Sequence, residues 1–106
     1  MPRYLFVARY TQQGAQALLA AGGTARRAAI DKMATDLGGR LETYDFAFGD
    51  DDVYAIIELP DERTAAAAAL AVNASGAARV RTVVLMTPED VDATAQVHAD
   101  YRPPGA

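Results

Sequence analysis

The chain of 106 residues contains no cysteine and a single histidine, and both shortages exclude classes of chemistry. Without cysteine there is no disulfide, no thiolate metal site and no cysteine nucleophile. The composition therefore does not indicate whether the protein works in an oxidising or a reducing compartment. The one histidine, His98, cannot form a cysteine–histidine pair, and the sequence shows no Ser-His-Asp placement for it. Because it lies near the C-terminus, we expect a solvated side chain rather than an axial haem ligand.

Long hydrophobic runs and an excess of positive charge are also missing. No stretch approaches the roughly 20 apolar residues that a membrane helix needs, and the first apolar run is broken by Arg9, unlike a signal peptide. The 10 basic and 14 acidic residues give a net charge of −4, and such a surface repels phosphate backbones. We therefore expect a cytoplasmic protein that binds neither membrane nor nucleic acid and needs no cofactor.

What is present is an ordinary globular balance, with 51% apolar and 23% charged residues. This length supports one hydrophobic core and not two. We expect a single domain over residues 1–106, of which residues 98–106 form a loose tail.

Aromatic and β-branched runs alternate with segments of helical spacing. Strands are predicted at residues 3–10, 40–48, 52–59 and 79–86, and helices within residues 11–23, 24–39 and 62–73 and after Thr87. Thr24, Asp61 and Thr87 are the expected N-terminal caps, and Gly38 the expected left-handed stop. The order β-α-β-β-α-β plus a terminal helix predicts an α+β, ferredoxin-like fold, with a four-stranded antiparallel sheet in the order 4-1-3-2.

Both faces of this predicted sheet are apolar. In the second strand, Tyr44 and Phe46 are expected on one face, and Leu41 and Thr43 on the other. An antiparallel sheet with one solvated face is instead polar on that side, and soluble monomers rarely expose a large apolar face. We expect the second face to be covered by another copy of the chain, by the terminal helix, or by both, and hence a homodimer or higher assembly.

A family resemblance extends over most of the chain. It rests on Tyr10-Thr11 followed by Gly14, on Arg26 and Arg27, and on the stretches "GGRLETYDFAFGDDDVYAIIELPD" and "NASGAARVRTVVLMTPED". Together they resemble the GYD-domain family, small bacterial proteins of the dimeric α/β-barrel superfamily. The resemblance implies a dimeric ferredoxin-like fold but no assigned activity. Relatives in the superfamily include cofactor-independent monooxygenases, haem enzymes and ligand-sensing domains.

The sequence departs from the family pattern in the stretch "FAFGDDDVYAIIEL". If Gly49 and Asp52 take the family's glycine and aspartate positions, Asp51 stands where the family has tyrosine. Gly and Asp tolerate the positive φ of a tight hairpin turn, so a plain acidic turn is one interpretation of Asp50, Asp51 and Asp52. A hard cation needs about six oxygen ligands, and no EF-hand spacing is present, so no metal is expected here.

The second interpretation is a ligand site at one edge of the sheet. The split order brings the end of the first strand, the acidic turn, the end of the alanine-rich helix and the start of the last strand together. The candidate ligand-binding residues at this rim are Arg9, Tyr10, Asp50, Asp52, Asn73 and Arg79. Together they could orient a small polar molecule.

Two classes of function therefore stay open. One is a small-molecule site, sensory or enzymatic, at the rim or in the cleft between sheet and helices. If enzymatic, it would use Tyr10, an Asp or an Arg for proton transfer or oxyanion stabilisation, in the manner of a cofactor-independent monooxygenase. The other is an oligomeric structural or accessory module without a ligand of its own.

Overall fold

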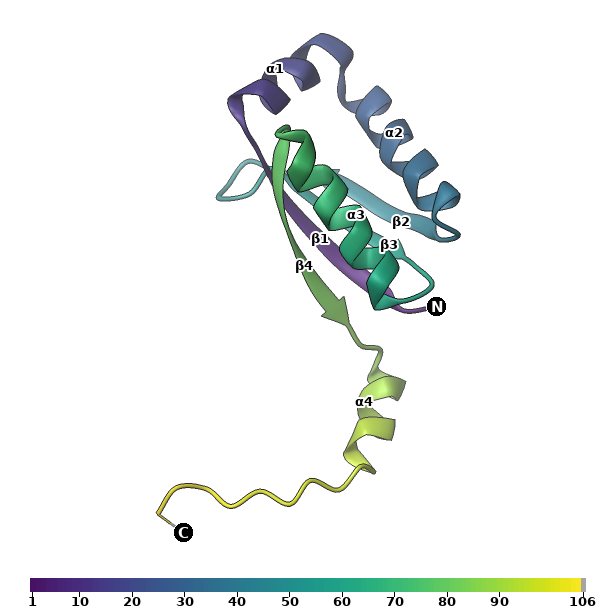
Figure 1. Cartoon of the computed structure of the whole chain (residues 1–106), viewed down its shortest axis with the longest axis vertical. Helices are drawn as coiled ribbons and strands as arrows, with labels where there is room; N and C mark the ends of the chain where they lie inside the picture. Colours follow the sequence, from purple (N-terminus) through teal and green to yellow (C-terminus); the bar gives the residue numbers. More distant parts are fainter. Residues whose placement is uncertain (106) are drawn as a thin grey trace.

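The computed structural model describes residues 1–105, which form an open four-stranded sheet and four helices (Figure 1). The strands are β1 (Arg3–Tyr10), β2 (Arg40–Phe46), β3 (Val53–Glu58) and β4 (Ala78–Leu85). The helices are α1 (Gln12–Ala21), α2 (Gly23–Asp36), α3 (Glu62–Ser75) and α4 (Pro88–Ala95). All neighbouring strands are antiparallel in the order β2-β3-β1-β4, which is 4-1-3-2 counted from the β4 edge. The predicted α+β class and ferredoxin-like arrangement are confirmed.

Two of the predicted helix caps are confirmed at the level of hydrogen bonds. The Asp61 carboxylate accepts from Thr64 N at 2.8 Å, and α3 begins directly after it. Thr87 and Asp90 form a reciprocal capping box ahead of α4. Gly38 has a φ of 83°, the left-handed conformation expected after α2.

The third predicted cap, Thr24, is wrong. Helix α2 begins at Gly23, two residues earlier than a cap at Thr24 implies, and Thr24 lies inside its first turn. The reason is Gly22, which has a φ of 90° and ends α1 by donating its N–H to the Leu18 carbonyl. One glycine in a conformation that other residues avoid thus joins two helices, and no side chain caps the second.

The acidic turn also differs from the tight hairpin that the sequence predicts. Strand β2 ends at Phe46 rather than residue 48, and a loop of residues 47–52 follows. Neither Gly49 nor the aspartates of this loop have positive φ. The loop is instead closed by main-chain bonds, with Ala47 N donating to Asp52 O at 2.8 Å and Asp52 N to Ala8 O at 2.9 Å.

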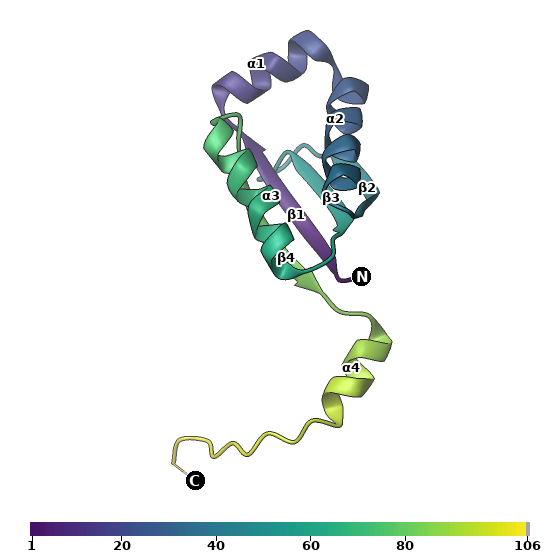
Figure 2. The same ribbon diagram turned by 45° about the vertical axis from the view of Figure 1, so that its right-hand side comes forward.

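The core lies between α2, α3 and one face of the sheet, as Figure 2 shows from a second side. The buried residues at its centre are Tyr4, Phe6, Ile30, Ala34, Ile57, Leu59 and Ala65. Leu41 and Tyr44 both pack against this cluster, so the prediction that they face opposite ways is wrong. A register shift between Leu41 and Thr43 is the cause, because an extra residue in a strand reverses the side to which the residues before it point.

The opposite face of the sheet, called the open face below, is apolar at its centre. Its apolar residues are Leu5, Val7, Tyr54, Ile56, Val83 and Leu85, which alternate with the core-facing residues of β1, β3 and β4. Tyr54 and Val83 are each 38% exposed. Helix α4 stands away from the sheet (Figures 1 and 2), and none of its residues is buried. The prediction that the terminal helix covers this face is therefore wrong.

Candidate functional site

The predicted rim residues Arg9 and Asp50 do meet, but through the main chain. The Arg9 guanidinium donates from Nε, at 2.8 Å, and from Nη2 to the backbone carbonyl of Asp50. Arg9 therefore holds the 47–52 loop against the end of β1 without using the Asp50 carboxylate. The neighbouring Asp51 carboxylate lies 3.4 Å from Arg81 Nη2, an exposed pair that contributes little to stability.

Asp52 and Asn73 serve the backbone. The Asp52 carboxylate accepts from Tyr10 N at 2.8 Å, at the point where β1 ends. The Asn73 side chain accepts from Val80 N at 2.8 Å and so ties the end of α3 to β4. Main-chain N–H groups at strand ends require an acceptor, and these two short side chains supply it.

The six predicted residues do not converge on one hollow, although two of them, Tyr10 and Asp52, line an open groove between α1 and the 47–52 loop. Arg79 lies opposite Arg9 in the strand register, exposed on the open face. Tyr10 is the one residue of the six that lines the interior cavity formed by residues 1–105. The structure thus divides the predicted rim into loop fasteners, surface arginines and one side chain that points inward.

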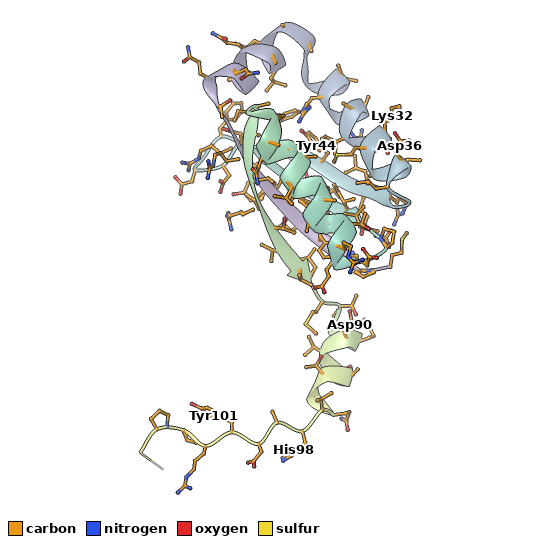
Figure 3. The ribbon with its side chains drawn as sticks, in the orientation of Figure 1. Lys32, Asp36, Tyr44, Asp90, His98 and Tyr101 are labelled. Carbon is orange, nitrogen blue, oxygen red and sulfur yellow. The ribbon has the colours of Figure 1, made fainter. Side chains whose placement is uncertain are left out.

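The interior cavity lies between the sheet, α2 and α3 and has a volume of about 50 Å³. Its walls are apolar except for three side chains that carry polar atoms, Tyr10, Tyr44 and Arg26. A second hollow of about 200 Å³ lies beneath α1, and it shares Tyr10 and Arg26 with the cavity. Figure 3 labels Tyr44 in the layer between the sheet and the helices.

The polar groups of the cavity are close together and incompletely satisfied. The Tyr10 and Tyr44 hydroxyls are 3.5 Å apart. The Arg26 Nε is buried and has no hydrogen-bond partner among residues 1–105. Such orphaned donors are uncommon in protein interiors and call for an explanation.

The environment of Tyr44 favours its protonated form. Burial and, after it, the hydrogen bond with Tyr10 raise the pKa of Tyr44 far above its ordinary value. The positive charge of Arg26 and a hydrogen bond between Arg26 and Tyr44 offset only part of this. Near neutral pH Tyr44 is therefore a hydrogen-bond donor and not a phenolate base.

Sequence reasoning did not place Tyr44 or Arg26 among the site residues, although Arg26 and Arg27 carried one signal, which fits an interface or anion role as well as a plain surface choice. Arg26 lies in the first turns of α2, where a positive charge opposes the helix dipole. A residue placed against a local electrostatic preference indicates another role. Tyr44 carried no comparable signal, because its position in an apolar strand face is typical of core packing.

Elsewhere, the described residues offer few alternative sites. His98 follows α4 and is exposed, far from the cavity (Figure 3). No cluster of three His, Asp or Glu side chains within residues 1–105 is arranged to hold a metal ion. None of the helices in that range has the length and apolarity needed to cross a bilayer.

Fold and cavity define a small α+β domain of the ferredoxin-like type, with a polar group of side chains inside an apolar layer. A comparison with protein families assigns it further. Residues 4–95 match the family model described as the GYD domain, and the chain belongs to this family. No curated protein and no solved structure matches the chain.

Proposed function

We propose that this domain binds a small molecule in the cavity lined by Tyr10, Arg26 and Tyr44. The observation that carries the proposal is the buried Arg26 Nε without a partner. Leaving a buried donor unsatisfied costs about 1–3 kcal/mol. A bound molecule whose acceptor reaches this point would remove that cost.

The space around these side chains supports the same proposal. The cavity of about 50 Å³ exceeds the roughly 10–15 Å³ that one ordered water needs. The larger hollow beneath α1 shares two lining side chains with it, Tyr10 and Arg26. A molecule that occupies both spaces has its polar group beside Tyr10 and Arg26, because these two side chains line both.

Binding is a better supported function than catalysis. The cavity lining contains no carboxylate, histidine or lysine that could act as a general base, and Tyr44 is held protonated. A monooxygenase-like reaction would need the substrate itself to supply the reactive carbanion or enolate. Tyr44 and Arg26 could then stabilise only the oxyanion.

The test begins with the untreated protein. The domain is purified without denaturant, extracted with organic solvent, and the extract is compared by mass spectrometry with that of Arg26→Met. We expect a small molecule that accompanies the wild type in stoichiometric amount and is lost from the variant. Arg27→Met, a neighbouring exposed arginine on the same helix, is the control and retains it.

A sample without a bound molecule is then titrated with a fragment library while amide and side-chain signals are followed by NMR. Shifts at Tyr10, Tyr44 and Val72, which line the cavity, support the proposal. A complete absence of shifts at these residues, with no molecule in the extract, contradicts it and favours an accessory module.

We also propose that two copies of the chain associate through their open faces, in the manner of a dimeric α/β barrel. Support comes from the apolar centre of that face and from Tyr54 and Val83, each 38% exposed. Light scattering at micromolar concentration should give a multiple of 11.2 kDa. A mass near that of one chain at every concentration would contradict the association and leave the cavity proposal untouched.

A further inference from the structure

The donors and acceptors of the cavity indicate which molecules it accepts. Three of the lining side chains carry nitrogen or oxygen atoms: Tyr10, Tyr44 and Arg26. The two hydroxyls can use one O–H between them, across 3.5 Å, which leaves the other O–H free to donate. The Arg26 Nε–H is a further free donor within residues 1–105. The site therefore has donors and one positive charge to offer.

We infer that the ligand is a small apolar carboxylic acid whose carboxylate lies between Arg26 and the two tyrosine hydroxyls. This inference rests on the proposed function and narrows it to one ligand class. A guanidinium presents its N–H groups in a planar fork that matches the two oxygens of a carboxylate, and charge-assisted bonds of this kind are short and strong. The free tyrosine O–H supplies an additional donor to the same group.

The charge of the lining excludes the opposite class of ligand. No Asp or Glu side chain lines the cavity. An ammonium group placed here would meet the Arg26 charge and find no counter-ion, at a large cost in a poorly solvated site. A neutral amide or alcohol can accept one hydrogen bond but leaves the positive charge unpaired.

The walls determine the rest of the molecule. Beyond the polar group they consist of Phe6, Ile30, Met33, Ala68, Ala69 and Val72, among other apolar residues. The alanines of α3 leave space that larger residues would fill, and Met33 is a flexible side chain that adapts its shape. Such walls offer a second polar group no partner, so the body of the acid is aliphatic or aromatic.

The experiment compares three acids with their uncharged amides on the full chain: benzoate with benzamide, octanoate with octanamide, and indole-3-acetate with its amide. Dissociation constants and the shifted residues are measured by NMR titration at pH 7 and constant ionic strength. We expect at least one acid to bind at the cavity residues at least tenfold more tightly than its amide. Arg26→Met should remove this preference, whereas Arg27→Met should keep it.

Each result decides a different statement. Equal binding of an acid and its amide at the cavity overturns the carboxylate inference and leaves the proposed binding function standing. No cavity shift with any of the six compounds overturns both. If Arg26→Met does not fold, the acid-to-amide ratio in the wild type decides alone. A preference for the acid that Arg27→Met abolishes while the cavity residues do not shift places binding on the outer surface and overturns the inference.

Discussion

Tyr44 lies in an apolar cavity with its hydroxyl 3.5 Å from that of Tyr10, and its protonation is coupled to folding. Its pKa is raised in the folded chain, chiefly by burial, whereas in the unfolded chain it titrates near its ordinary value of 10.0. Above that pH the folded chain binds more protons than the unfolded chain, so the free energy of unfolding falls as pH rises. The contribution of protonated Tyr44 to the free energy of unfolding is present in full below pH 10 and is lost as the pH rises above it.

We therefore expect Tyr44→Phe to lose less stability than the wild type between about pH 9.5 and 11. Chemical unfolding at several pH values in this range measures the slope for each protein. Tyr101→Phe, which alters a side chain 73% exposed in the tail, is the control and should keep the wild-type slope. An unchanged slope in Tyr44→Phe would contradict the buried environment of this hydroxyl.

Asp52 gives a second prediction at the residue scale, because its carboxylate holds the main chain of Tyr10. Asp52→Ala leaves that N–H without its acceptor and should reduce the free energy of unfolding by about 1–3 kcal/mol. Asp50→Ala is the matched control, since Arg9 contacts the Asp50 carbonyl, which alanine retains. The measurement is urea unfolding of the three proteins.

The same variants separate structure from binding. If Asp52 contacted the ligand, Asp52→Ala would bind it at least tenfold more weakly than the wild type. We expect its affinity for a cavity ligand to stay within about twofold of the wild type once the protein is folded, well below a tenfold change of 1.4 kcal/mol. A larger loss would return Asp52 to the site.

Residue types at the rim could be predicted from the sequence, but their partners could not. The split order correctly indicated that Arg9, Tyr10 and the aspartates of the 47–52 loop meet at one edge. Whether a carboxylate faces solvent or a backbone N–H depends on a rotation of one side chain. No periodicity encodes that choice, whereas the alternation along β1 does place Tyr10 on the same face as the buried Tyr4 and Phe6.

At the scale of elements, the contact between α1 and the start of β4 depends on Gly14. A Cβ built on this residue would lie 1.8 Å from the carbonyl oxygen of Ala77, so the helix and the strand could not approach as they do. Thr11 fastens the same junction, because its hydroxyl donates to Gly76 O at 2.6 Å and its N–H to Ala77 O at 3.1 Å.

We expect Gly14→Ala to destabilise the chain by about 1–3 kcal/mol, the usual cost of forcing an extra group into a packed contact. Gly49→Ala is the control, because a Cβ there meets nothing within 4 Å and its φ is not positive. Thermal unfolding of both variants should separate them clearly. Equal melting temperatures would show that α1 adjusts its position without cost, and would make the hollow beneath it variable in size.

The starts of α3 and α4 and the glycine stop after α2 were predictable, whereas the start of α2 was not. Asp61 and Thr87 have the short acceptors that cap helices, and both were found from the sequence. The junction at Gly22 depends on a backbone conformation that glycine permits but does not require. The shift between Leu41 and Thr43 in β2 likewise leaves no mark in the alternation of residues.

For the whole molecule, the sheet has helices on one face and an apolar open face on the other. The sequence predicted this asymmetry because both sides of each strand are apolar, and an antiparallel sheet with a solvated face would be polar there. It could not predict whether anything covers the second face, since that depends on molecules outside the chain. Helix α4, one expected cover, stands away from it (Figure 1).

Charges on the open face bear on how two copies would meet. Arg9 and Arg79 lie directly opposite each other on β1 and β4, and like charges in this position oppose strand pairing. Acidic groups supplied by another copy would offset that repulsion. Residues 86–106 contain Glu89, Asp90, Asp92 and Asp100 but a single basic residue, Arg102, so this segment is a suitable source.

A charge placed among the apolar residues of the open face tests the proposed association most directly. Val83→Arg puts a guanidinium where two apolar faces would meet, and a buried charge without a partner costs several kcal/mol. Light scattering should therefore show the mass of one chain for this variant at concentrations where the wild type is associated. Leu70→Arg alters an equally apolar side chain on α3, 67% exposed on the other side of the sheet, and should keep the wild-type mass. If both variants remain associated, the copies meet through another surface. The open face would then be stable in water without a cover, because Val7 at its centre is only 2% exposed within a single chain.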